Sequence, residues 1–173
     1  MLPTDKKIKT KSLQEALTSL MRQCAKAERS SGDALRLMRR WGINPQEQQQ
    51  ILARLIKDRF IDDKRYAEAF VREKYNLSAW GEFKIRAALR NKGISPAIID
   101  EAMHQLSSIN SSERLMERLR RKMRTTKYDS AYQLKGKLVR HGISLGYHTD
   151  QVIECVETIM KDINDEKECN DIF

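Results

Sequence analysis

Lysine and arginine side chains recur at three comparable places along this 173-residue chain, each on a segment whose apolar spacing predicts a helix. Guanidinium and ammonium groups bind phosphates, and a row of them suits a long anion because each contact releases counterions. Taken singly, such residues are also typical of a solvated helix face, but their repetition favours a common role. The candidate contact residues of this set are Arg36, Arg39, Arg40, Lys84, Arg86, Arg90, Lys92, Lys135, Lys137 and Arg140.

A further basic cluster lies between Arg114 and Lys127, with Glu113 and Glu117 as its nearby acidic residues. The cluster covers more than one face of its predicted helix, so part of it must be exposed. A solubilising helix and a partner-binding helix explain this pattern equally well. The candidate contact residues from this cluster are Arg118 and Arg121.

Other chemistry has little support in the sequence. Asp62 and Asp63 are adjacent at a predicted helix start, where the helix dipole favours negative charge, so we expect capping and packing rather than acid–base work. The histidines at 104, 141 and 148 lack metal-ligand spacing, and the sequence contains no phosphate-binding glycine loop, nucleophile elbow or dinucleotide fingerprint. We therefore expect a protein that is not an enzyme and that uses no cofactor or metal.

The composition is typical of a helical, well-solvated protein. Charged residues make up 33% and aromatic residues 6% of the chain, and the net charge of +9 favours nucleic acid, an acidic protein or anionic lipid as partner. Three widely spaced cysteines indicate neither a disulfide framework nor a zinc site. Because no segment has the apolar length of a signal peptide or a membrane span, we expect a cytoplasmic protein with no membrane partner.

A short motif is repeated, and it organises the predicted helices. Gly42 opens Gly-Ile-Asn-Pro, Gly93 opens Gly-Ile-Ser-Pro 51 residues later, and Gly146-Tyr147 follows after another 53 residues. Glycine suits the residue just beyond a helix end, and Asn-Pro or Ser-Pro suits the start of the next helix. Gly142 is an alternative register for the third copy; we prefer Gly146, with Gly142 inside a longer helix.

These signals predict an all-α chain of three tandem three-helix repeats. A fifty-residue unit leaves much of its chain exposed, so the repeats should stack on one another into an elongated array. The predicted ranges are a basic N-terminal extension at 1–11, repeats at 12–58, 59–109 and 110–162, and an acidic tail at 163–173.

The second repeat carries the most specific pattern. Its run Phe-Ile-Asp-Asp-Lys-Arg-Tyr-Ala-Glu-Ala-Phe-Val-Arg at 60–72, followed by Gly81, Ile85, Leu89 and Lys92-Gly-Ile, strongly resembles the RecX family of recombination regulators. The resemblance is densest over residues 55–106 and extends to the first and third repeats. It implies that the three repeats form a curved array.

The resemblance also implies a function without catalysis. RecX proteins bind the RecA recombinase filament on single-stranded DNA and inhibit its ATPase, strand exchange or growth. We therefore expect the partners to be the RecA filament and the single-stranded DNA within it, with the chain acting as a monomer. The alternative is direct binding to DNA, since helices joined by a glycine turn are also typical of helix-turn-helix units.

Overall fold

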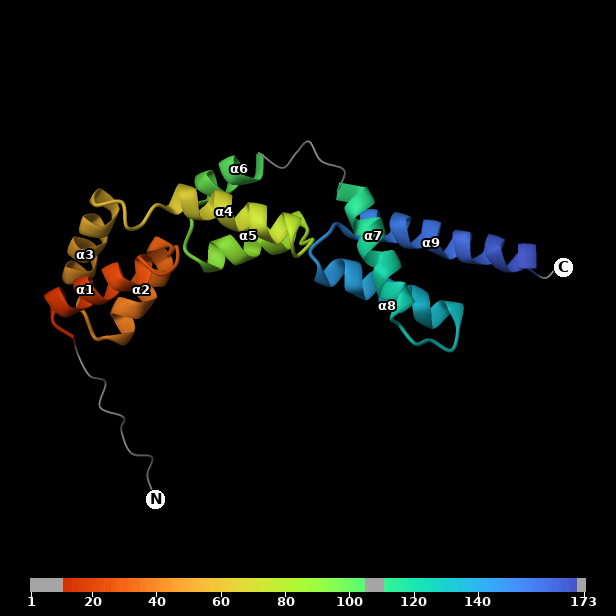
Figure 1. Ribbon diagram of the computed structural model, residues 1–173, viewed down its shortest axis with the longest axis horizontal. Coiled ribbons are helices and arrows are strands. Elements are labelled where there is room, and N and C mark those ends of the chain that lie inside the picture. Colours follow the sequence, from red (N-terminus) through yellow and green to blue (C-terminus); the bar gives the residue numbers. More distant parts are fainter. Residues whose placement is uncertain (1–10, 105–110, 171–173) are drawn as a thin grey trace, which may run out of the picture. The chain divides into compact units, whose positions relative to one another are not determined.

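The computed structural model describes residues 11–104 and 111–170, and these stretches form nine α-helices with no strand (Figure 1). The all-α prediction is therefore confirmed. The helices are α1 (Leu13–Cys24), α2 (Ser31–Arg40), α3 (Pro45–Lys57), α4 (Asp63–Asn76), α5 (Glu82–Asn91), α6 (Pro96–His104), α7 (Ser111–Arg124), α8 (Ala131–Ser144) and α9 (Thr149–Asn170). None of the described helices is both long and apolar enough to cross a lipid bilayer.

Short polar side chains begin several of these helices, as their spacing predicts. The Ser12 hydroxyl accepts from the backbone N–H of Glu15, whose carboxylate accepts in return from the Ser12 backbone. The Asn44 side chain accepts from the backbone N–H of Glu47, and Pro45 occupies the first turn of α3. These bonds satisfy backbone donors that a helix start leaves unpaired.

The same glycine turn ends α2, α5 and α8. Gly42, Gly93 and Gly146 have φ angles of 71°, 78° and 87°, which L side chains rarely adopt. The Gly146 register of the third copy is thereby confirmed. Gly142 lies inside α8, where a β-carbon would stand 2.6 Å from the side chain of Val152 on α9.

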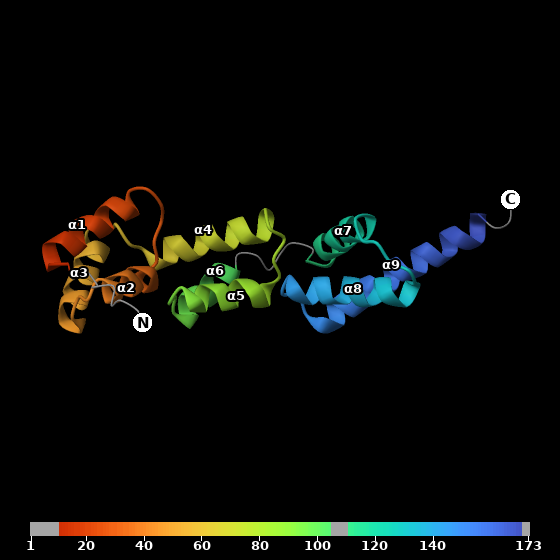
Figure 2. The same ribbon diagram turned by 90° about the horizontal axis from the view of Figure 1, so that it is seen from below.

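The chain divides into two compact units, and the first comprises residues 1–70 and 89–102. Within it, α3 packs against both α1 and α2 (Figures 1 and 2). The buried apolar side chains of this cluster are Ala16, Leu20, Ala34, Met38, Ile43, Ile51, Leu55 and Ile61.

The start of α2 packs against the turn that follows α5 in this first unit. A β-carbon on Gly32 would stand 2.1 Å from the carbonyl oxygen of Lys92, and the Ser30 hydroxyl donates to that oxygen at 2.8 Å. The carboxylate of Asp63, at the start of α4, accepts from the backbone N–H of Ser31 at 2.8 Å. Backbone and capping groups therefore fasten α2 to the segments that follow it.

The second unit comprises residues 71–88 and 103–173, and in its described part α7, α8 and α9 pack pairwise against one another. The buried side chains of this cluster are Leu115, Leu119, Leu134, Leu138, Leu145, Tyr147, Val152, Cys155, Val156 and Ile159. The start of α5 packs against the turn after α8, because Gly81 N–H donates to the Leu145 carbonyl at 2.7 Å. A β-carbon on Gly81 would stand 2.3 Å from the Gly146 carbonyl oxygen.

The predicted ranges of the three repeats and their elongated, curved stacking stay predictions. The helix bounds lie within the predicted ranges except at the end of the chain, where α9 continues past residue 162 to Asn170.

Candidate functional site

Two of the predicted contact residues hold the ends of helices. Arg36 on α2 donates through Nη1 to the carbonyl of Asn91, the last residue of α5. Lys84 on α5 donates through Nζ to the carbonyl of Ser144, the last residue of α8, at 2.9 Å. Both carbonyls belong to the residue two places before a turn glycine. A cation at a helix C-terminus satisfies an unpaired carbonyl and interacts favourably with the negative end of the helix dipole. These two side chains therefore connect successive helical segments, and we call them the joint cations.

Other predicted contact residues are neutralised by neighbouring carboxylates. Lys92 lies 3.0 Å from Asp33, which also pairs with Arg36. Ion pairs also join Arg86 to Glu82 at 2.6 Å, Arg121 to Glu117 at 3.0 Å and Lys135 to Glu157 at 3.3 Å. Their charges are partly compensated within the protein, which weakens their attraction for an external anion.

Three predicted contact residues of the first unit remain exposed and uncompensated. Arg39 and Arg40 occupy the last turn of α2, and Arg90 occupies the last turn of α5. Within the described residues none of the three pairs with a carboxylate, and Arg39 donates only to the Leu35 carbonyl of its own helix, at 3.4 Å. We call these three residues the arginine set.

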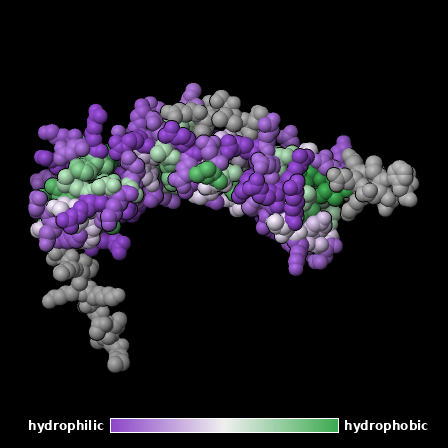
Figure 3. Space-filling model, viewed as in Figure 1, coloured by the Kyte–Doolittle hydropathy of each residue, from purple (hydrophilic) through white to green (hydrophobic). Residues whose placement is uncertain are grey.

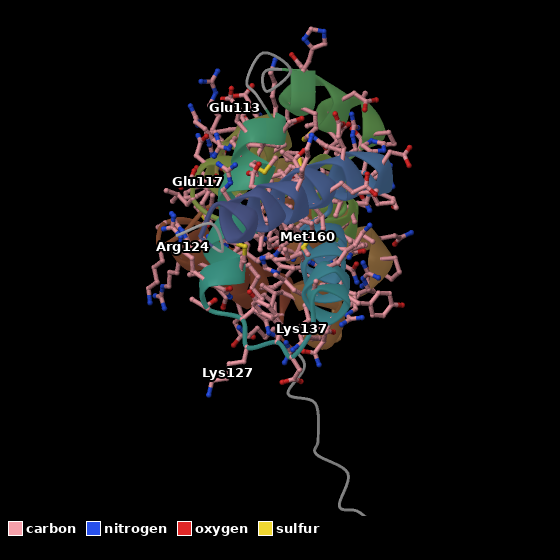
Figure 4. The ribbon with its side chains drawn as sticks, turned by 90° about the vertical axis from the view of Figure 1, so that its right-hand side faces the viewer. Glu113, Glu117, Arg124, Lys127, Lys137 and Met160 are labelled. Atoms are coloured by element: carbon pink, nitrogen blue, oxygen red, sulfur yellow. The ribbon has the colours of Figure 1, made fainter. Side chains whose placement is uncertain are left out.

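In the second unit, basic side chains line a groove beside α8. The groove has a volume of about 510 Å³, and we call it the α8 groove. It is lined by Lys122, Thr125, Thr126, Lys127, Lys137, Arg140, His141 and Ser144, with no carboxylate among them. Lys137 and Lys127 lie together at one end of the unit (Figure 4), where Lys137 Nζ donates to the Lys127 carbonyl at 2.7 Å.

The electrostatics of His141 reflect the charge of this region. Partial burial lowers the pKa of the imidazole, and the nearby cations Lys122, Arg118 and Lys84 lower it further. Like charges from α7 and α5 therefore disfavour a positive charge on α8 at this point. An anion placed in the groove would relieve that repulsion.

The candidate residues on α7 face a different environment. Figure 3 shows hydrophilic side chains gathered over α7, and a second groove of about 550 Å³ runs along this helix. Glu113 and Glu117 line it beside Arg120, Arg121 and Arg124. Figure 4 labels Glu113, Glu117 and Arg124 of this lining. Arg118 is half-buried, and its Nε makes no hydrogen bond within the described part of the chain. The α7 groove thus mixes two carboxylates with three arginines, whereas the α8 groove has no carboxylate in its lining.

The paired aspartates have the structural role that their position predicts. Asp62 accepts from the backbone N–H of Arg65 at 3.0 Å, so it caps α4, while Asp63 accepts from Ser31 at the start of α2. Their carboxylates hold the starts of two different helices, and the prediction of capping is confirmed.

The sequence reasoning missed two residues of α8 that lie outside the groove lining but on the same helix. Tyr132 is 88% exposed, and Gly136 lies one turn further along the helix. The alternation of basic residues with an aromatic residue over 127–140 is the signal that could have drawn attention to Tyr132.

Known proteins match much of this chain. Residues 62–103 match the family model described as RecX, second three-helix domain. Regulatory protein RecX from Bacillus mycoides is 28% identical over 119 residues, which cover 69% of this chain and 44% of that protein. Regulatory protein RecX from Bacillus thuringiensis matches with the same identity and coverage. The chain therefore spans less than half the length of these curated relatives.

Two solved structures share the fold. The crystal structure of RecX from Lactobacillus salivarius is 20% identical, with a TM-score of 0.70 over 84% of this chain and 95% of that chain. A crystal structure of regulatory protein RecX is 22% identical, with a TM-score of 0.73 over 87% of this chain and 73% of that chain. This likeness establishes an all-helical fold of the same kind.

Proposed function

We propose that this chain, which belongs to the RecX family, binds the RecA filament on single-stranded DNA and inhibits its ATPase, strand exchange or extension. The curated relatives are named regulatory proteins, and the sequence resemblance supplies RecA as the target. In this proposal the chain acts in the cytoplasm as a monomer, without catalysis and without a cofactor.

The arginine set is the observation that carries the proposal. Arg39, Arg40 and Arg90 are exposed, and no carboxylate within the described residues neutralises them. By contrast, Arg36 donates to the carbonyl of Asn91 on α5, and Lys92 pairs with Asp33. Exposed charges steer association, and their electrostatic attraction is strongest for a partner of opposite charge. A filament that encloses DNA provides such a partner, and the net charge of +9 points the same way.

The test is inhibition of the RecA ATPase on single-stranded DNA by a variant carrying Arg39→Glu, Arg40→Glu and Arg90→Glu. We expect the concentration needed for half-inhibition to rise by about tenfold or more, since each reversed charge repels the anionic partner. Circular dichroism should show unchanged helix content, because none of the three side chains is buried.

A matched control carries Arg22→Glu, Lys57→Glu and Arg72→Glu. These residues are also exposed, and both triple variants lower the net charge from +9 to +3. The control should inhibit like the unmodified protein. Equal loss of inhibition in both variants would show that only net charge matters, and full inhibition by the first variant would reject the arginine set.

Direct DNA binding remains the second candidate, favoured by the α8 groove and its lack of carboxylates. Tight, sequence-selective binding to protein-free duplex DNA would support it. Inhibition of the filament with only weak, salt-sensitive binding to duplex supports the first candidate.

A further inference from the structure

Gly136 has no structural reason to be glycine. The chain has seven glycines, of which three adopt positive φ and three others would place a β-carbon within 2.6 Å of neighbouring atoms. A β-carbon on Gly136 would meet only the guanidinium of Arg140, at 3.6 Å, which is ordinary contact with a flexible side chain. Glycine within a helix costs about 1 kcal/mol relative to alanine. A position that bears this cost without a packing reason fits close approach by a partner.

Gly136, which is half-buried, lies between exposed side chains on one face of α8. Tyr132, Gly136, Arg140 and Ile143 follow one another at spacings of four, four and three, so they share one side of the helix. Tyr132 is 88% exposed and Ile143 is 45% exposed. The Arg140 guanidinium extends back toward the half-buried Gly136, 3.6 Å from where a β-carbon would stand, so at this point only a flexible side chain covers the backbone.

The α8 groove adjoins this face through Arg140, which belongs to both. Lys122 contributes charge to the groove from the last turn of α7, Lys127 from the α7–α8 connection and Lys137 from α8. Thr125 and Thr126 hydroxyls lie among these cations and donate to the Lys122 carbonyl. The groove thus holds three lysines and Arg140, and the exposed Tyr132 ring lies on the adjoining face of the same helix.

We infer that this surface of α8 binds a single-stranded nucleic acid, with phosphates in the α8 groove and a base against Tyr132. Stacking needs an unpaired base, which a duplex does not offer, and cations beside an exposed aromatic ring suit single strands. Because Gly136 has no side chain, only the flexible Arg140 guanidinium lies between α8 and an approaching sugar–phosphate segment. The inference rests on the proposed function in one respect: the strand in the filament would be the source of this ligand.

Two other grooves in the described part of the second unit do not fit such a ligand. The α7 groove contains Glu113 and Glu117 beside three arginines, of which Arg120 pairs with Asp162 and Arg121 with Glu117. The groove along α9 is lined by Asp150, Glu154 and Glu157 beside Lys161. Carboxylates at these positions would repel phosphates, so charge complementarity selects the α8 groove.

The test measures binding of the full chain to a fluorescent 20-nucleotide oligothymidylate by anisotropy, without recombinase. Tyr132→Ala should weaken binding about 5- to 100-fold, whereas Tyr132→Phe, which keeps the ring, should bind normally. Lys137→Gln should weaken binding and make its salt dependence less steep by about 0.7 in the logarithmic slope. Gly136→Ala should weaken binding severalfold while raising the melting temperature, so misfolding cannot explain the loss.

Lys161→Gln on α9 is the matched charge control and should leave binding and its salt slope unchanged. A duplex probe or poly-glutamate that binds as tightly as the oligothymidylate, with no effect of Tyr132→Ala, would overturn the inference in favour of a general anion site. Absence of oligothymidylate binding would also overturn it.

The recombinase ATPase assay separates this inference from the proposed function. Inhibition that survives Tyr132→Ala and Lys137→Gln, without oligothymidylate binding by the unmodified protein, rejects the inference alone. Oligothymidylate binding without ATPase inhibition rejects the proposed function alone.

Discussion

Gly32 lies directly against the backbone of Lys92, with room for a hydrogen but not for a β-carbon, which would stand 2.1 Å from the Lys92 carbonyl oxygen. The second unit has the corresponding contact, because a β-carbon on Gly81 would stand 2.3 Å from the carbonyl oxygen of Gly146. In both places the start of one helix meets the turn after a later helix, backbone against backbone. Such a contact cannot adjust by a side-chain rotation.

Alanine at Gly32 or Gly81 should therefore destabilise the protein. The added methyl forces the backbone to shift, and overpacking of this kind typically costs about 1–3 kcal/mol. Urea denaturation followed by circular dichroism measures the change in the free energy of unfolding. Gly136→Ala is the matched control on α8: its methyl meets only a flexible side chain, so we expect about 0.4–1 kcal/mol of added stability. Equal stability of all three variants would contradict the backbone contacts.

Local features of the fold could be predicted from the sequence because each has a short-range cause. Glycine at 42, 93 and 146 adopts the positive φ that ends a helix, and Ser12 and Asn44 accept from backbone donors a few residues away. The preference for Gly146 over Gly142 rested on the apolar spacing of α9, which the buried cluster of the second unit bears out.

The roles of the basic side chains could not be predicted in the same way. Arg36 and Arg39 look alike in the sequence, yet Arg36 reaches the Asn91 carbonyl 55 residues away and Arg39 stays at the surface. The difference depends on how α2 meets the end of α5. A helix-face pattern indicates which residues are polar, but not which of them find a partner in another segment.

Loss of the joint cations should lower stability, whereas loss of the arginine set should not. Arg36→Met and Lys84→Met keep apolar length but leave the Asn91 and Ser144 carbonyls without these donors, so we expect each to cost about 0.5–2 kcal/mol. Arg90→Met, at an exposed position, should stay within about 0.5 kcal/mol of the unmodified protein. Thermal unfolding at low and high salt provides the measurement. A destabilisation by Arg90→Met equal to that of the other two would contradict the assignment.

Asp63 should contribute more to stability than a surface carboxylate normally does. Asp63→Ala removes the acceptor for both the backbone N–H and the hydroxyl of Ser31, and the lost capping should cost about 1–2 kcal/mol. Asp63→Asn retains a side-chain oxygen and should cost less. Hydrogen exchange at the start of α2 should report the change locally. Unchanged protection at the start of α2 in Asp63→Ala would show that the Asp63 carboxylate does not stabilise this helix end.

His141 should make the protein less stable as the pH falls below neutrality. Its pKa is lowered in the folded protein by burial and by Lys122, Arg118 and Lys84, so the unfolded chain binds the proton more readily. The contribution is present above the ordinary histidine pKa of about 6.5 and is lost as the pH falls through the lowered folded value. His141→Gln should flatten the stability curve over this range, and His104→Gln provides the control for loss of one imidazole. Because an anion in the α8 groove stabilises the protonated ring, added oligothymidylate should raise the pKa of His141 in an NMR titration. A titration midpoint above the ordinary value in the free protein would contradict this account.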